Sequence, residues 1–204
     1  MAKRIVEESS LVSVANAIRA KAKLTGSLTF PDGFVSAIGG IKGGSNLAPM
    51  VDGSITEVTA DMMEGCTNIR LYAFYNCSSL TSIVIPDSVT SIGASAFYGC
   101  KSLTSIVIPS GVTSIRASTF YNCVSLTSIV IPSGVTSIGN QAFVACSKLT
   151  TVELKRTTPP TLSSNSFYGC SALTKIIVPA GTLSAYQSAT NWSKYADLMV
   201  EASA

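Results

Sequence analysis

The sequence of 204 residues contains no histidine, and only 12% of its residues are charged. The absence of histidine excludes, within one chain, a Ser-His-Asp triad, a Cys-His pair and any zinc site with a histidine ligand. The formal net charge of +3 is too small to indicate nucleic-acid binding. The chain also lacks the charged, Pro-rich or Gln/Asn-rich tracts that are typical of disordered proteins. We therefore expect a folded protein with no nucleic-acid partner.

Long hydrophobic runs are missing as well. A secretory signal needs about 7 to 15 consecutive apolar residues near the start of the chain, whereas this sequence begins MAKRIVEESSL. No stretch approaches the roughly 18 apolar residues of a membrane span. We expect no membrane span and no signal peptide, so that the protein would be made in the cytoplasm.

The six cysteines recur with a period. They lie at residues 66, 77, 100, 123, 146 and 170, so that the successive spacings are 11, 23, 23, 23 and 24. A phenylalanine precedes each of the last five cysteines by three residues, and a leucine follows each by three. Fixed self-similarity with such a period predicts a repeat solenoid. The phenylalanines are Phe74, Phe97, Phe120, Phe143 and Phe167.

One full unit, CKSLTSIVIPSGVTSIRASTFYN, shows how a coil would be built. Ile106 and Ile108 are two residues apart, so they share the buried face of a short strand. Pro109 suits the end of that strand because it has no ladder donor. Val112 to Ile115 forms a second extended piece, and a turn then places Phe120 inside. Stacked coils at about 4.8 Å would pair these strands in parallel. The expected fold class is therefore an α+β repeat solenoid with short parallel strands.

The even number of cysteines leaves two interpretations. An oxidising compartment could pair them, but side chains related by a repeat translation point the same way, and a disulfide needs facing Cβ atoms. We favour buried thiols that fill space. No C-x-x-C motif occurs and each coil has one thiol, so we expect no metal site, and no motif indicates a cofactor.

The repeat is irregular at both ends of the array. The short spacing between Cys66 and Cys77 is interpreted as an N-terminal cap, residues 46–77, from which a strand and turn are missing; the solenoid spans residues 46–180. One extra residue beside Pro159-Pro160 predicts a local bulge. A helical C-terminal cap, residues 181–204, would cover the last coil. The residues expected to cover it are Leu183, Tyr186, Trp192, Tyr195 and Leu198.

Residues 1–45 are predicted to form a small helical module with a Gly-rich joint at 39–45. Apolar residues at helical spacing predict two short amphipathic helices. Together they are too small to bury both apolar stripes, so we expect a homo-oligomer or docking to a partner through them. Capping of the solenoid is the alternative. The candidate contact residues are Leu11, Val14, Ile18, Phe34, Ile38 and Ile41.

The repeated pattern L-x-x-I-x-I-P-x-x-V-x-x-I-x-x-x-A-F-x-x-C resembles the BspA-like leucine-rich repeats, over about two thirds of the chain. That resemblance implies adhesion to proteins or matrix and transfers no catalytic motif. The segment ESSLVSVANAIRAKAKLTGSLTFPDGFVSAI is similar to N-terminal modules of tail and other virion-associated proteins from phages of Gram-positive gut bacteria. Many bacterial members of the repeat class carry a signal peptide. Its expected absence here favours a virion protein, with a bacterial cell-surface or cytoplasmic protein as the alternative.

The outward strand positions predict a flat, weakly charged surface that suits contact with a protein or glycan. Small hydroxyls lie beside valines there, although exposed strands favour these residues in any case. A separate column of tyrosines follows the phenylalanines, with Val144 interrupting it, and offers either a binding surface or packing over the turn. The outward columns are Ser82, Ser105, Ser128, Thr151 and Lys175, and Val84, Val107, Val130, Glu153 and Ile177. The tyrosine column is Tyr98, Tyr121 and Tyr168.

An enzyme needs a constellation that the repeats do not offer. The only acids in the array, Asp87 and Glu153, are almost three coils apart, or about 14 Å, beyond the separation of an inverting glycosidase pair. We expect a non-enzymatic protein: a phage virion or tail-fibre component that attaches to a host cell-surface protein or glycan, together with other virion proteins. The alternatives are a bacterial adhesion or interaction module and, remotely, a hydrolase that depends on Glu153.

Overall fold

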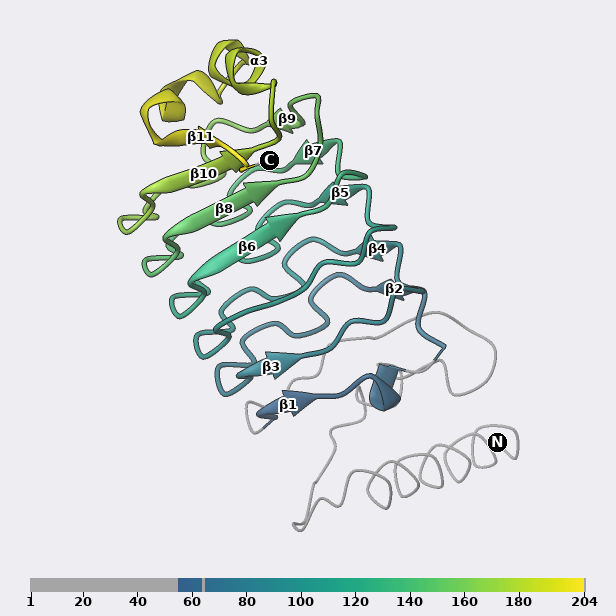
Figure 1. Cartoon of the computed structure of the whole chain (residues 1–204). Helices are drawn as coiled ribbons and strands as arrows, with labels where there is room; N and C mark the ends of the chain where they lie inside the picture. The colour runs from purple at the N-terminus through teal and green to yellow at the C-terminus, as the bar shows by residue number, and fades with distance from the viewer. Residues whose placement is uncertain (1–54, 64, 204) are drawn as a thin grey trace, which may run out of the picture.

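A computed structural model of the chain describes residues 55–63 and 65–203. The predicted N-terminal helices, with their residues for oligomerisation or docking, lie outside the described residues. The described part is a β-solenoid whose coils stack along one axis (Figure 1). Among the described residues α3 is the one α-helix, and the coils are built from strands and turns. The described fold is therefore mostly strand and differs from the α+β arrangement expected. Coils 1 to 6 are residues 55–77, 78–100, 101–123, 124–146, 147–170 and 171–203.

Coils 1 to 5 each have a long-strand side, a short-strand side and a turn side that leads to the next coil. The long-strand side contains β1 (Glu57–Val58), β3 (Ser82–Ile83), β6 (Ser128–Ile131), β8 (Thr151–Leu154), β10 (Lys175–Val178) and β11 (Met199–Glu201). The short-strand side contains β2 (Asn68–Ile69), β4 (Ser91–Ile92), β5 (Ser114–Ile115), β7 (Ser137–Ile138) and β9 (Thr161–Leu162). The helices are η1 (Asp61–Met63), α3 (Leu183–Ser188) and η2 (Ser193–Leu198).

The strands pair in parallel, as the repeat predicts. Ile129 of β6 aligns with Val152 of β8, which aligns with Ile176 of β10, and all three side chains are buried. On the short-strand side, Ile115 aligns with Ile138. Equivalent apolar side chains therefore meet in columns, and together they form one continuous core. Burial of these columns is the main favourable contribution to folding.

The turn side is held by stacked rings and by backbone bonds between coils. The five phenylalanine rings stack at centroid distances of 5.1, 5.4, 5.3 and 5.1 Å. The amide of Phe97 donates to the carbonyl of Thr119 at 2.9 Å, and the amide of Phe120 donates to that of Ala142 at 2.8 Å. These turns need left-handed backbone, with Gly99 at φ 71° and Asn122 at φ 58° in equivalent positions. Glycine and asparagine adopt that conformation at the lowest cost.

The junction between coils 2 and 3, which we call the seam, differs from its neighbours. No backbone hydrogen bond joins the strands of coil 2 to those of coil 3 among the described residues, and Figure 1 shows the long strand of coil 3 as a plain tube between β3 and β6. The threonine hydroxyls follow the same pattern. Thr90 donates to Thr67 at 3.4 Å and Thr136 to Thr113 at 3.2 Å, but no such bond from Thr113 crosses the seam.

A single position on the short-strand side accounts for the seam. A Cβ atom added to Gly93 would lie 2.3 Å from the Leu71 nitrogen of the coil below, and one added to Gly139 would lie 2.7 Å from the Ala117 nitrogen. Coil 3 has Arg116 at this place, so its Cβ keeps coil 3 away from coil 2. The turn side still bonds across the seam, for example from the Gly99 amide to the Tyr121 carbonyl at 2.8 Å.

Coil 5 tolerates a side chain at the same position. Ser163 donates to Ile138 at 3.1 Å, a longer bond than the 2.7 and 2.8 Å formed by Gly93 and Gly139. The loop that precedes Ser163 holds the extra residue of the repeat, since Ile131 and Ser137 align with Leu154 and Thr161. We infer that this extra residue gives the short strand of coil 5 the freedom to shift.

The first coil is complete, and the prediction that it lacks a strand and turn was wrong. β1 pairs with β3, and Ile69 aligns with Ile92. Cys66 lies three residues before Ile69, as Val89 lies three residues before Ile92. The sulfur of Cys66 therefore occupies a valine position of the short-strand side and does not belong to the cysteine column. The short cysteine spacing reflects this change of position.

The C-terminal cap covers the last coil in the predicted way. Trp192 and Tyr186 are fully buried. The Trp192 Nε1–H donates to the Pro160 carbonyl at 2.7 Å, and the Tyr186 hydroxyl donates to the Arg156 carbonyl at 2.7 Å. Both acceptors lie in the lengthened loop of coil 5. The cap is therefore anchored to this loop by hydrogen bonds. The sequence did not predict β11, which extends the long-strand sheet by one parallel strand.

Candidate binding surfaces

The long-strand side presents the two predicted columns in register. Val130 aligns with Glu153, which aligns with Ile177, and Val107 forms an isolated bridge with Val130. Val84 is separated from Val107 by the seam. The exposed fractions of the Val84, Val107 and Val130 side chains are 55%, 77% and 43%. The valine stripe is thus exposed, and it is most exposed at the seam.

The hydroxyl column beside the valines is accessible to a ligand. Ser105, Ser128 and Lys175 are exposed, whereas Ser82 and Thr151 are half-buried. The hydroxyls of Ser105 and Ser128 form no hydrogen bond with a described residue, so their donors remain available. The neighbouring threonines of coils 2, 4, 5 and 6 are already engaged, because each donates to a carbonyl of the preceding coil, whereas Thr104 of coil 3 forms no such bond with a described residue. Among these is the bond from Thr127 to Thr104, at 3.3 Å.

The charge on this side lies toward the C-terminal coils. Glu153 of β8 forms an ion pair with Lys155, the one ion pair among the residues that the structure describes. Asp87 lies in the turn of coil 2, three coils away. No three His, Cys, Asp or Glu side chains gather as possible metal ligands within residues 55–63 and 65–203.

The tyrosine column differs from the one predicted. Tyr75, Tyr98 and Tyr121 stack at centroid distances of 4.7 and 4.6 Å, whereas Tyr168 stands apart with 73% of its side chain exposed. Val144, at the interrupting position, is buried. Burial, with the neighbouring Tyr121 and Tyr75, raises the pKa of Tyr98. Sequence reasoning missed Tyr75, although it follows Phe74 as Tyr98 follows Phe97.

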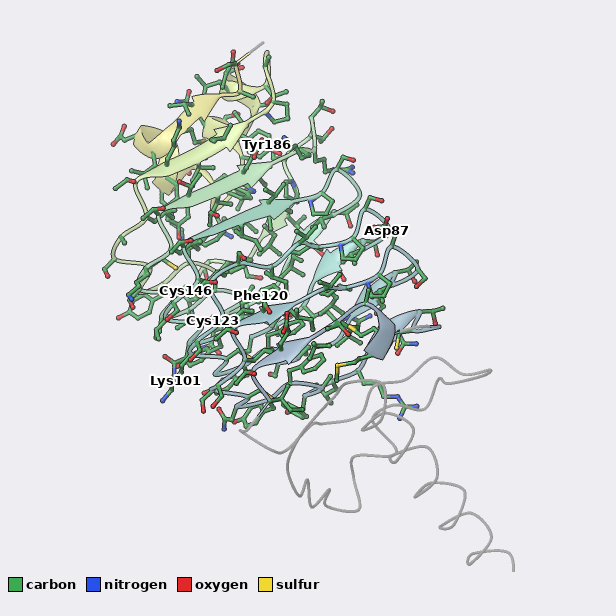
Figure 2. The ribbon with its side chains drawn as sticks, turned by 60° about the horizontal axis from the view of Figure 1, so that its bottom comes forward. Asp87, Lys101, Phe120, Cys123, Cys146 and Tyr186 are labelled. Carbon is green, nitrogen blue, oxygen red and sulfur yellow. The ribbon has the colours of Figure 1, made fainter. Side chains whose placement is uncertain are left out.

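The thiols make bonds between coils in addition to filling space. The Cys123 thiol donates to the Phe97 carbonyl at 3.1 Å, and the Cys146 thiol donates to the Phe120 carbonyl at 3.1 Å. Figure 2 shows Cys123 and Cys146 near Phe120. No disulfide occurs between the described residues, in agreement with the favoured interpretation. Burial raises the pKa of Cys123 to about 12, so this thiol stays protonated at neutral pH.

An open depression of about 470 Å³ lies on the short-strand side of coils 1 to 3, and sequence reasoning missed it. Arg70 and Arg116 are among its lining residues, with Gly93 between them in the repeat. The signal was present in the sequence, since these residues recur at the 23-residue period immediately after a buried isoleucine. The binding surface that the sequence predicts lies on the long-strand side only.

No helix among the described residues is long and apolar enough to cross a membrane. The parallel columns, the stacked phenylalanines and the short coils instead define a leucine-rich repeat solenoid. The chain belongs to the BspA-type leucine-rich repeat family, whose model matches residues 67–195 in six copies. No curated protein sequence matches the chain at a significant level.

Solved structures support the same class. The chain is similar to a leucine-rich cell surface protein of Faecalibacterium prausnitzii, with 33% identity and a TM-score of 0.60 over 67% of this chain and 35% of that one. It is similar to a leucine-rich repeat protein of T. pallidum, with 34% identity and a TM-score of 0.56 over 62% and 60%. The pneumococcal vaccine antigen PcpA, at 20% identity, a TM-score of 0.53 and coverage of 61% and 30%, shares the fold. The chain thus spans about a third of the length of the first of these.

Proposed function

We propose that this chain is a non-enzymatic binding protein that attaches to a cell-surface protein or glycan through its long-strand side. The observation that carries the proposal is the exposed valine stripe of Val84, Val107 and Val130, flanked by serine hydroxyls that form no hydrogen bond with a described residue. Apolar stripes of this kind are typical of interaction surfaces. The description of the Faecalibacterium prausnitzii relative as a cell surface protein supports the same role.

The experiment screens the full chain against immobilised glycans and extracellular-matrix proteins, and then compares variants on each ligand that binds. The double variant Val107→Lys/Val130→Lys places two cations in the stripe without disturbing the core, so we expect binding to weaken at least tenfold while stability changes by less than about 0.5 kcal/mol. Tyr168→Lys, on the turn side, is the matched control. Equal weakening by Tyr168→Lys, or no weakening by the double variant, would refute the proposed surface.

Two locations fit this function, and they differ in what residues 1–45 do. In a phage virion or tail fibre, as the sequence favours, these residues would form a homo-oligomer or dock to other virion proteins. On a bacterial cell surface, the location printed for the relative, the chain could act as a monomer. Light scattering of the full chain distinguishes them: the virion proposal requires a mass above that of one 21.1 kDa chain at high concentration. A strict monomer would favour the bacterial surface.

A further inference from the structure

The short-strand depression has the features of a ligand site that is separate from the long-strand side. It spans three coils, from Thr67 of coil 1 to Arg116 of coil 3. Arg70 and Arg116 are exposed, and neither guanidinium forms an ion pair or hydrogen bond with a described residue. Their positions are two coils apart, or about 10 Å at the usual strand spacing. Two cations without an ion-pair partner among the described residues therefore lie on either side of one open surface.

Gly93 keeps the space between the two arginines open. The equivalent positions in coils 1 and 3 are Arg70 and Arg116. Along these three coils the position therefore changes from arginine to glycine and back to arginine. A Cβ atom at Gly93 would collide with the backbone of Arg70, so only glycine fits this position in the observed packing. One anionic group could thus approach both guanidinium groups without a side chain in between.

The remaining lining is suited to a sugar. The Asn68 amide and the Ser91 hydroxyl form no hydrogen bond with a described residue, so both can bond to sugar hydroxyls. Leu71, 51% exposed, gives an apolar patch for the face of a pyranose ring. The site is shallow and open, whereas pockets for compact apolar ligands are enclosed. Guanidinium groups bind carboxylate and sulfate oxygens in a bidentate manner.

We propose that the depression between Arg70 and Arg116 binds an acidic saccharide that carries a carboxylate or a sulfate group. This site does not depend on the long-strand proposal, because the two surfaces share no residue. An acidic protein segment could also be attracted by the arginines. The polar and apolar groups between them favour a sugar, which needs hydroxyl partners as well as a cation.

The test uses calorimetry on the full chain with four probes: an oligogalacturonate, a chondroitin sulfate oligosaccharide, a neutral cello-oligosaccharide and a poly-glutamate peptide. We expect binding of at least one acidic saccharide, no binding of the neutral one, and weaker binding of the peptide. Oligogalacturonate carries carboxylates alone, whereas chondroitin sulfate carries carboxylates and sulfates, so binding of chondroitin sulfate without binding of oligogalacturonate would show that the sulfate is recognised. Stronger binding of poly-glutamate, or equal binding of the neutral sugar, would overturn the assignment, as would the absence of binding by both acidic sugars.

The variants test the two arginines individually. Arg70→Gln and Arg116→Gln should each weaken saccharide binding about tenfold, because each removes one charged partner and leaves a shorter, neutral polar side chain. Lys101→Gln is the control. Lys101 lies outside the depression, at the margin of the stack in Figure 2, so the loss of its charge should leave the affinity unchanged. Equal loss with Lys101→Gln would show general charge attraction and refute the site. The Val107→Lys/Val130→Lys variant should retain saccharide binding, which separates this site from the long-strand side.

Discussion

The junction between coils 4 and 5 and the seam between coils 2 and 3 come from the same repeat, yet they are held differently. Coils 4 and 5 pair through β6 and β8, through β7 and β9, and through the turn side. Among the described residues, backbone hydrogen bonds join coils 2 and 3 on the turn side alone. The comparison teaches that the apolar repeat determines which coils stack, while the residue at one close-approach position determines whether their strands bond.

The largest difference between the two junctions should appear when a stacked ring is removed. Phe120→Ala deletes a fully buried ring that stacks on Phe97 across the seam, and a loss of about 3 to 5 kcal/mol in the free energy of unfolding is expected. Phe143→Ala, next along the stack, is the matched control. Because the hydrogen bonds that cross the seam between described residues all lie on the turn side, Phe120→Ala should cost more than Phe143→Ala in urea unfolding. An equal or smaller loss at Phe120 would contradict this role of the turn side.

A second seam should form when an arginine is placed at a closed junction. Gly139→Arg introduces a Cβ where only 2.7 Å separates it from the Ala117 nitrogen. It should break the bonds from Thr136 to Thr113 and from Gly139 to Ile115, with a loss of about 2 to 3 kcal/mol. Urea unfolding measures the loss, and the matched control is Asn140→Arg, one residue further along. A similar loss for both variants would show that charge or size, and not the close approach, is responsible.

The seam should close when its arginine is removed. Arg116→Gly lets coil 3 approach coil 2, so that the amides of Thr113 and Arg116 can donate to coil 2. Two such bonds at about 1 kcal/mol each, less about 0.5 to 1 kcal/mol for the added glycine, predict a small net gain in stability. Arg116→Ala retains the Cβ and should give no gain. If Arg116→Ala stabilises the protein equally, the Cβ does not cause the seam.

The repeat made much of this fold predictable. Ile106, Ile108 and Phe120 could be assigned to the core from spacing alone, because a solenoid repeats one environment in every coil. Cys66 was misassigned because a buried thiol and a buried valine are interchangeable at an apolar position. The strand β11 follows the cap and belongs to no repeat, so periodicity could not predict it. The seam and the depression depend on the contrast between Arg116 and Gly93, a departure from the repeat whose effect becomes clear only from the distance between coils.

The binding surfaces were predictable to different degrees. Alternation along a strand placed Val107 and Val130 outward, which the structure confirms, although a ligand for them remains a proposal. The tyrosine column was predictable only in part. Tyr168 follows Phe167 as the other tyrosines follow theirs, but buried Val144 separates it from Tyr121, so stacking ends at Tyr121, two coils before Tyr168.

Amide hydrogen exchange, followed residue by residue on the full chain, tests the central claim most directly. The account predicts slow exchange at Thr136 and Gly139, whose amides bond to the preceding coil, and fast exchange at the equivalent Thr113 and Arg116, whose amides do not. Phe97, bonded across the seam on the turn side, should exchange slowly. Equal protection at Thr113 and Thr136 would contradict the account, because it would mean that the strands of coils 2 and 3 are paired.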